Sequence, residues 1–209
     1  MDGNGEATVI GTKPRTTSEE IRIEILRKSI HLLIALVPTL AWISAPVTVG
    51  LLAAGILVYT ACELLRMRGV QVPLVSRVTS RAARHRDAGK FVRGPITLGL
   101  GALLSLLIFP FEAASIAIYA LAFGDGLSSL VGKLFGRIRL PLTGGKSLEG
   151  SLTCFSAVFI ASFLVSGKAA GSLCVAAIAM VTEAAPLKDF DNIILPLVAG
   201  AAALLFLHI

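Results

Sequence analysis

Long apolar blocks separated by short polar segments dominate this chain from residue 29 onward. A membrane-crossing helix needs about 20 predominantly apolar residues. The blocks predict seven such helices, at 29–45, 46–65, 94–110, 113–131, 151–167, 171–183 and 193–208. Residues 1–20 are polar and are expected to form a disordered cytoplasmic tail, which leaves 21–209 as one domain. The predicted fold is therefore an all-α polytopic membrane bundle.

Basic residues lie almost entirely on one side of this arrangement. The segment before the first helix carries five of them, the 66–93 connection eight, the 132–150 connection four and the 184–192 connection one. The remaining base is Lys168, in a connection on the other side. The positive-inside rule then places the N-terminus in the cytoplasm and the C-terminus outside.

The net charge of +6 is not interpreted as a nucleic-acid signal, because these bases flank apolar blocks. In the 66–93 connection, Arg77, Arg81 and Arg84 share one face of a possible helix. This pattern predicts an interfacial segment that contacts anionic lipid. The sequence does not predict an oligomeric state.

Asp125 is the sharpest candidate for chemistry, because a carboxylate inside an apolar span is costly unless it is paired or holds a cation. Ser128, Ser129, Gly132 and Gly136 follow it at helical spacing and form a small, polar stripe. Packing of helices through the two glycines would explain the stripe but not the acid. An Asp125→Asn variant is expected to stay folded, because it removes a buried charge.

Further polar residues cluster at the same end of the predicted bundle. Glu24, Arg27, Lys28 and His31 share one helical face, which could bind phosphate or anchor the helix at the membrane surface. Glu63 lies at the end of the second span, one helical turn before Arg66. Glu63 is either a functional acid or one partner of a structural ion pair, and the sequence does not choose between these two hypotheses.

The segment 143–151, TGGKSLEGS, is rich in glycine and hydroxyl groups. It is not a P-loop, because Leu140 stands where that motif requires glycine. Its backbone amides, Lys146, Ser147 and Ser151 could still hold phosphate at a helix start. Glu149 suits the helix dipole or could ligate a metal. The last connection adds oxygen-bearing residues that suit Mg²⁺ or simply face solvent, namely Glu183, Asp189, Asp191 and Asn192.

Taken in order, these motifs resemble the polyprenol kinase family, which comprises dolichol kinase, phytol kinase and the CTP-dependent diacylglycerol kinases and is related to the phosphatidate cytidylyltransferases. The resemblance covers about residues 24–200. It depends on E-x-x-RK-x-x-H at 24–31, RGP at 93–95, GDG at 124–126, KSLEGS at 146–151, E-x-x-P at 183–186 and DN at 191–192. Gly126 and Phe190 depart from the usual family pattern, and Phe190 leaves one fewer carboxylate beside Asp191.

The resemblance implies a membrane lipid kinase that transfers phosphate from a nucleotide, typically CTP, to a lipid alcohol such as a polyprenol, phytol or diacylglycerol. It implies active-site roles for Arg27, Lys28, Asp125 and Gly132. Nucleotide binding is further expected of Arg93, Lys146, Ser147, Glu149 and Ser151. Mg²⁺ is expected at Asp125 and Asp191, and Asp125 could instead accept the hydroxyl proton. The alternatives are a cytidylyltransferase that makes a CDP-lipid, a membrane transporter and a non-catalytic membrane subunit.

Overall fold

The computed structural model describes residues 18–70 and 90–209, and throughout these ranges the chain is helical apart from short connections. The predicted tail lies largely outside the described residues, as does most of the basic 66–93 connection. The first helical stretch consists of α1 (Ser18–Leu32), the 3-10 turn η1 (Leu33–Leu36) and α2 (Val37–Met67). It is followed by α4 (Gly94–Ile108).

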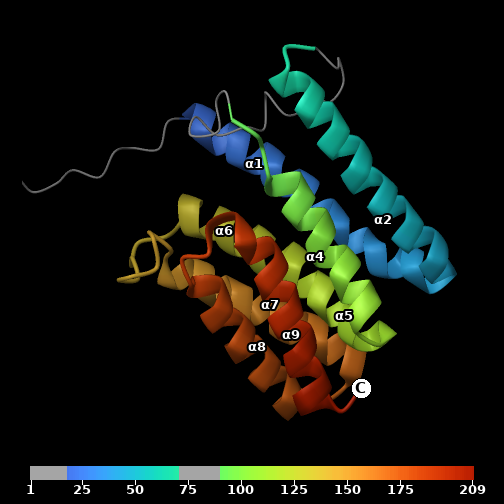
Figure 1. Ribbon diagram of the computed structural model, residues 1–209. Helices are drawn as coiled ribbons and strands as arrows, with labels where there is room; N and C mark the ends of the chain where they lie inside the picture. The colour runs from blue at the N-terminus through green and yellow to red at the C-terminus, as the bar shows by residue number, and fades with distance from the viewer. Residues whose placement is uncertain (1–17, 71–89) are drawn as a thin grey trace, which may run out of the picture.

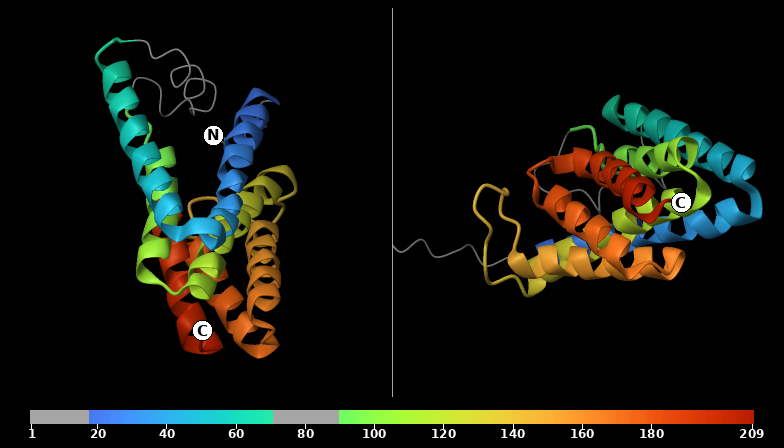
Figure 2. Two further views of the ribbon diagram at one scale, coloured as in Figure 1. Left: turned by 90° about the vertical axis from the view of Figure 1, so that its right-hand side faces the viewer. Right: turned by 90° about the horizontal axis from the view of Figure 1, so that it is seen from below.

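The first stretch reverses direction within α2. Ser44 has an extended backbone (φ −158°, ψ 100°), two residues before Pro46. Proline has no N–H with which to continue the helical hydrogen bonds, so a break at this point is expected. The two arms meet at this bend and diverge toward their other ends (Figure 1; Figure 2). Helical segments thus occupy both regions predicted at 29–45 and 46–65.

A central helical stretch is more deeply buried than the other three long apolar helices in the described part of the chain. It comprises α5 (Phe111–Tyr119), the π-helical turn η3 (Ala120–Asp125) and α6 (Gly126–Leu134). Around it pack α7 (Leu148–Ser166), α8 (Ala169–Ala184), the 3-10 turn η4 (Lys188–Phe190) and α9 (Asp191–Leu207). Alanines dominate the core between α5, α7, α8 and α9. Small side chains let apolar helices approach closely, as is common in membrane bundles.

Four helices in the described part of the chain are long and apolar enough to cross a membrane: Ile21–Met67, Phe111–Leu134, Leu148–Ser166 and Lys188–Leu207. The first has 47 residues and would measure about 70 Å if straight, more than twice the bilayer core. Because it reverses at Ser44, it has the length for two passes. Gly94–Ile108 and Ala169–Ala184 are shorter apolar helices. All-helical architecture is therefore confirmed, while seven crossings and the orientation of the N-terminus stay predictions.

Glycines set how closely α6 and α7 approach at one end of the bundle. A side-chain carbon added at Gly150 would lie 2.7 Å from the carbonyl oxygen of Ser128, and one at Gly132 would lie 3.0 Å from Ser147 Oγ. Gly136 lies beyond the end of α6, where an added carbon would be 2.2 Å from the Gly132 carbonyl oxygen. The glycine stripe therefore faces the start of α7 and brings the 135–147 connection against α6.

Candidate functional site

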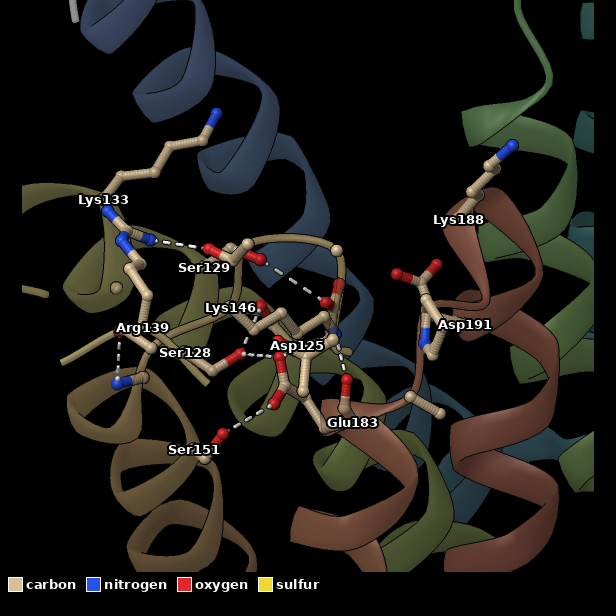
Figure 3. Close-up of a pocket in the computed structure, with 18 of the residues that line it drawn as sticks. Asp125, Ser128, Ser129, Lys133, Arg139, Lys146, Ser151, Glu183, Lys188 and Asp191 are labelled. Atoms are coloured by element: carbon tan, nitrogen blue, oxygen red, sulfur yellow. Dashed lines mark hydrogen bonds and ion pairs between the residues drawn. The ribbon is translucent and has the colours of Figure 1, made fainter. Parts of the chain in front are cut away.

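A polar cavity of about 370 Å³ lies at the end of the bundle where α1, α6, α7, α8 and α9 meet (Figure 3). Six basic residues and four acidic residues line it: Arg27, Lys28, Lys133, Arg139, Lys146 and Lys188, with Glu24, Asp125, Glu183 and Asp191. Glycines and hydroxyl residues complete the wall, including Ser128, Ser129, Gly132, Gly144, Gly145, Ser147, Gly150 and Ser151. The excess of positive charge suits a polyanionic ligand.

Asp125 occupies the last residue of the π-helical turn η3 and is buried. Lys28 Nζ donates to Asp125 Oδ2 at 2.6 Å and to the Asp125 carbonyl oxygen at 3.2 Å. Ser129 Oγ donates to the other carboxylate oxygen at 3.4 Å. Lys28 is itself buried, so each charge supplies the partner that the other needs inside the protein. Single π-helical turns often occur at functional sites, and this one carries the candidate acid.

His31 lies behind Asp125 rather than in the cavity wall. Its Nε2 is 2.8 Å from the carbonyl oxygen of Leu121, inside the π-helical turn, and 3.3 Å from Asp125 Oδ2. A carbonyl oxygen only accepts hydrogen bonds, so Nε2 carries a proton in this arrangement. His31 therefore stabilises the π-helical turn that positions Asp125.

The Glu24–His31 face of α1 packs against α6 and η3, so the residues that the helical spacing grouped do meet Asp125. Glu24 accepts from both Arg27 and Lys133. Lys133 comes from α6, so Glu24 joins two helices at the cavity edge. These contacts hold two cations, Arg27 and Lys133, beside the third cation, Lys28.

Glu183 links three elements at the cavity floor. Its carboxylate accepts from Lys146 Nζ at 2.8 Å, from Ser128 Oγ at 3.1 Å and from Ser151 Oγ at 3.4 Å. Lys146 also donates to the Glu183 carbonyl oxygen. Ser147 caps α7, where its side chain accepts from the Gly150 amide at 3.1 Å. The buried acid thereby fixes the glycine connection against α6 and α7.

Asp191 begins α9 on the opposite side of the cavity from Lys133 and Arg139 (Figure 3). The neighbouring residue Asn192 is buried, and its Nδ2 donates to Thr97 Oγ1 of α4 at 2.9 Å. This bond ties the start of α9 to α4. Asn192 is thus outside the cavity wall but next to a residue that faces it.

Three other predicted residues do not line the cavity. Arg93 is exposed at the start of α4. Glu63 is buried and accepts hydrogen bonds from Arg66 and from the Val92 amide. Of the two hypotheses for this residue, a functional acid and a structural ion pair, these contacts favour the ion pair. Glu149 Oε1 accepts hydrogen bonds from the Arg137 and Ile138 amides, so this acid holds the α6–α7 connection in place from a position outside the cavity. Nucleotide binding by Arg93 and Glu149 stays a prediction.

Sequence reasoning missed Lys133, Arg139 and Lys188 as cavity residues and treated them only as topology signals. Arg139 Nη1 donates to the Gly145 carbonyl oxygen at 2.6 Å, which holds the base of the glycine connection together. Lys133 follows Asp125 by about two helical turns. This spacing was the available indication that Lys133 lies near Asp125. No signal in the sequence pointed to Thr97.

Carboxylates in the cavity fit a magnesium ion that takes most of its ligands from phosphate and water. Mg²⁺ commonly uses one or two protein carboxylates together with substrate phosphates. Asp125 and Asp191 both line the cavity and could supply these two. Within residues 18–70 and 90–209 there is no group of three or more His, Cys, Asp or Glu side chains that could hold a metal by itself.

Comparison with curated proteins identifies relatives along nearly the whole chain. Phytol kinase 1 of Arabidopsis thaliana, a chloroplastic protein, is 27% identical over 223 residues, covering 97% of this chain and 73% of the relative. Phytol kinase of Synechocystis sp. is 35% identical over 145 residues, covering 68% of this chain and 57% of the relative. Farnesol kinase of Arabidopsis thaliana is 29% identical over 143 residues, 66% of this chain and 46% of the relative.

No protein-family model and no solved structure matches the chain. The curated relatives nevertheless confirm the resemblance that the motifs predicted: the chain is related to the phytol and farnesol kinases of the polyprenol kinase family.

Proposed function

We propose that this chain is an integral membrane lipid kinase that transfers the γ-phosphate of CTP to an isoprenoid alcohol of the phytol or farnesol type. The names of the relatives support the lipid alcohol and the kinase reaction. The observation that carries the proposal is the buried Lys28–Asp125 pair at the wall of a cation-rich cavity. Mg²⁺, the choice of CTP and the cytoplasmic side of the cavity are parts of the proposal.

Phosphoryl transfer depends mainly on positioning the reactants and neutralising charge. The lipid hydroxyl oxygen attacks the γ-phosphorus, and the bond from that phosphorus to the β–γ bridging oxygen breaks. CDP leaves, and the hydroxyl proton passes to a carboxylate or to water. Arg27, Lys28 and Lys146 are placed to bind the triphosphate oxygens. Lysine and arginine both bind phosphate, and arginine can do so with two parallel hydrogen bonds.

Asp125 and Asp191 have separable roles in this proposal. Asp125 Oδ2 faces Lys28 and His31, while its other oxygen faces Ser129. Asp191 lies across the cavity, with one oxygen accepting from the amide of its neighbour Asn192. Asp125 and Asp191 would hold Mg²⁺, which would supply positive charge to neutralise the phosphates. Asp125 is the candidate to accept the hydroxyl proton if Asp191 is the principal metal ligand.

The reaction assay uses the purified full chain with CTP labelled at either the γ- or the α-phosphate. We offer phytol, farnesol, geranylgeraniol, dolichol and diacylglycerol as acceptors, and ATP, GTP and UTP as alternative donors. The expected result is γ-label in the phosphate ester of an isoprenoid alcohol, with release of CDP. Transfer of α-label into lipid with release of pyrophosphate would instead establish the cytidylyltransferase alternative. Absence of label from every lipid would favour the transporter or the non-catalytic subunit.

A further inference from the structure

The connection between α6 and α7 exposes several large apolar side chains close together in the sequence. Phe135 is 67% exposed, Ile138 57% and Leu142 96%, and Leu134 at the end of α6 is 47% exposed. Exposed apolar groups that gather in one segment commonly mark a site of contact with a partner or a membrane. We call residues 134–142 the apolar loop. The described part of the chain leaves this surface uncovered.

The position of the apolar loop identifies that partner. Leu134 ends one helix that is long and apolar enough to cross a membrane, and Leu148 begins another. The connection between them therefore stays close to the surface of the bilayer if these helices cross it. Figure 1 shows the connection level with the end of α8 and the start of α9, and the second view in Figure 2 shows it projecting sideways from the bundle. This placement suits a segment that lies along the membrane surface.

Charge supports the same partner. Arg137 and Arg139 alternate with the apolar residues in the order Phe-Gly-Arg-Ile-Arg-Leu-Pro-Leu, and both arginines are exposed. Apolar side chains that enter the boundary between head groups and acyl chains, with arginines beside them, are typical of segments that bind anionic membrane surfaces. A water-facing connection would not need four large apolar side chains.

We propose that the apolar loop inserts into the interface of an anionic bilayer through Phe135, Ile138 and Leu142, with Arg137 contacting lipid phosphate. The inference rests on the membrane embedding contained in the proposed function and is independent of the kinase reaction. It also gives the loop a mechanical role. Arg139, Thr143, Gly144 and Gly145 line the cavity, so an inserted tip anchors one wall of that cavity to the membrane.

The test uses tryptophan fluorescence, because the chain has a single tryptophan, Trp42. The full chain with Trp42→Phe receives either Leu142→Trp or Ile138→Trp and is reconstituted in vesicles of phosphatidylglycerol and brominated phosphatidylcholine. Bromine quenches only nearby indoles. We expect emission at both sites to fall at least about twofold relative to unbrominated vesicles, and to be shielded from acrylamide in water. Thr143→Trp in the same background is the matched control, because Thr143 lines the cavity, and it should be quenched less.

Two comparisons separate the possible failures. Native Trp42, which is exposed on α2, should be quenched by brominated lipid in the unmodified protein. If Trp42 is quenched while positions 138 and 142 stay accessible to acrylamide, the loop proposal is wrong and the membrane embedding stands. If Trp42 is not quenched either, the embedding fails and the loop proposal fails with it.

The charge component is tested with Arg137→Gln and Arg137→Lys in the Leu142→Trp protein. Replacing phosphatidylglycerol by neutral lipid, or Arg137 by glutamine, should weaken quenching, and lysine should restore it. Equal quenching in neutral and anionic vesicles for all three proteins would overturn the anionic part of the proposal.

Discussion

At the scale of single residues, the central feature is a buried ion pair rather than an isolated buried acid. Lys28 and Asp125 are 97 positions apart, both are buried, and Lys28 Nζ lies 2.6 Å from Asp125 Oδ2. The sequence alone suggested that Asp125→Asn would preserve stability by removing a costly charge. The pair changes that expectation, because the variant leaves Lys28 buried without its counter-charge.

Asp125→Asn should therefore lose both activity and stability. Removing one partner of a buried pair costs about 3–5 kcal/mol, and removing a general base costs roughly 10²–10⁴-fold in rate. Thermal unfolding in detergent measures the first effect, and the CTP assay the second. The double variant Lys28→Met with Asp125→Asn should unfold at a higher temperature than Asp125→Asn alone. A double variant that is less stable than both single variants would show that the two side chains are not coupled.

Glu183→Gln should raise the KM for the nucleotide by about tenfold or more, because a hydrogen bond to a charged group contributes about 1.5–3 kcal/mol. The variant loses the charge that holds Lys146 at the cavity floor. Glu63→Gln is the matched control: Glu63 is buried and paired with Arg66 at 2.7 Å but lies outside the cavity. The control should lose stability and keep its nucleotide KM. A lower KM in Glu183→Gln would show instead that Glu183 competes with phosphate for Lys146.

At the scale of elements, helix termini converge on the cavity. Their positions are set by local features: a helix break, close contacts at glycines and an interhelical hydrogen bond. The break at Ser44 turns α2 back, glycines bring α6 onto α7, and the Asn192–Thr97 bond ties α9 to α4. The Asn192–Thr97 hydrogen bond matters for the proposed chemistry because Asp191 directly precedes Asn192. Fixing the backbone of α9 at Asn192 also fixes the direction from which Asp191 faces the cavity.

Thr97→Val should therefore raise the Mg²⁺ concentration needed for half-maximal activity several-fold. It leaves the buried Asn192 amide without its partner, which costs about 1–3 kcal/mol. Ser105→Ala is the control, since Ser105 is buried in the same helix and its hydroxyl donates within that helix, to the Gly101 carbonyl oxygen at 2.8 Å. Both variants should be somewhat less stable, and only Thr97→Val should shift the Mg²⁺ titration. An unchanged titration in Thr97→Val would remove Asn192 from the positioning of Asp191.

At the scale of the whole molecule, polar residues gather at one end of the bundle and apolar side chains cover its flanks. The end of α2 lies at the upper end in Figure 1, whereas the α7–α8 connection and the C-terminus lie at the lower end. The cavity, with the six bases that line it, lies where the end of α8 and the start of α9 meet α1 and α6, away from the α7–α8 connection. An enzyme that takes a water-soluble nucleotide and a lipid alcohol needs this arrangement, because its two substrates meet at a membrane surface.

Arg68 and Lys168 should accordingly lie on opposite sides of the membrane. Arg68 directly follows α2, and Lys168 directly precedes α8. Each is replaced by cysteine in a protein whose native cysteines, Cys62, Cys154 and Cys174, are changed to alanine. A membrane-impermeant maleimide applied to intact cells should label Lys168→Cys, and Arg68→Cys only after permeabilisation. Labelling of both from the same side would contradict the seven-crossing topology.

The sequence by itself determined the helical class and the approximate helix positions. Apolar blocks and helical spacing are local properties, so they also grouped Glu24, Lys28 and His31 on one face and singled out Asp125. Only the tertiary structure decided which groups meet. It paired Lys28 with Asp125 and Lys146 with Glu183, put Asp191 across the cavity, and left Arg93 and Glu63 outside it. Those outcomes depend on how distant helices pack, and no local spacing encodes the π-helical turn or the exact approach of α6 to α7, both of which help to set that packing.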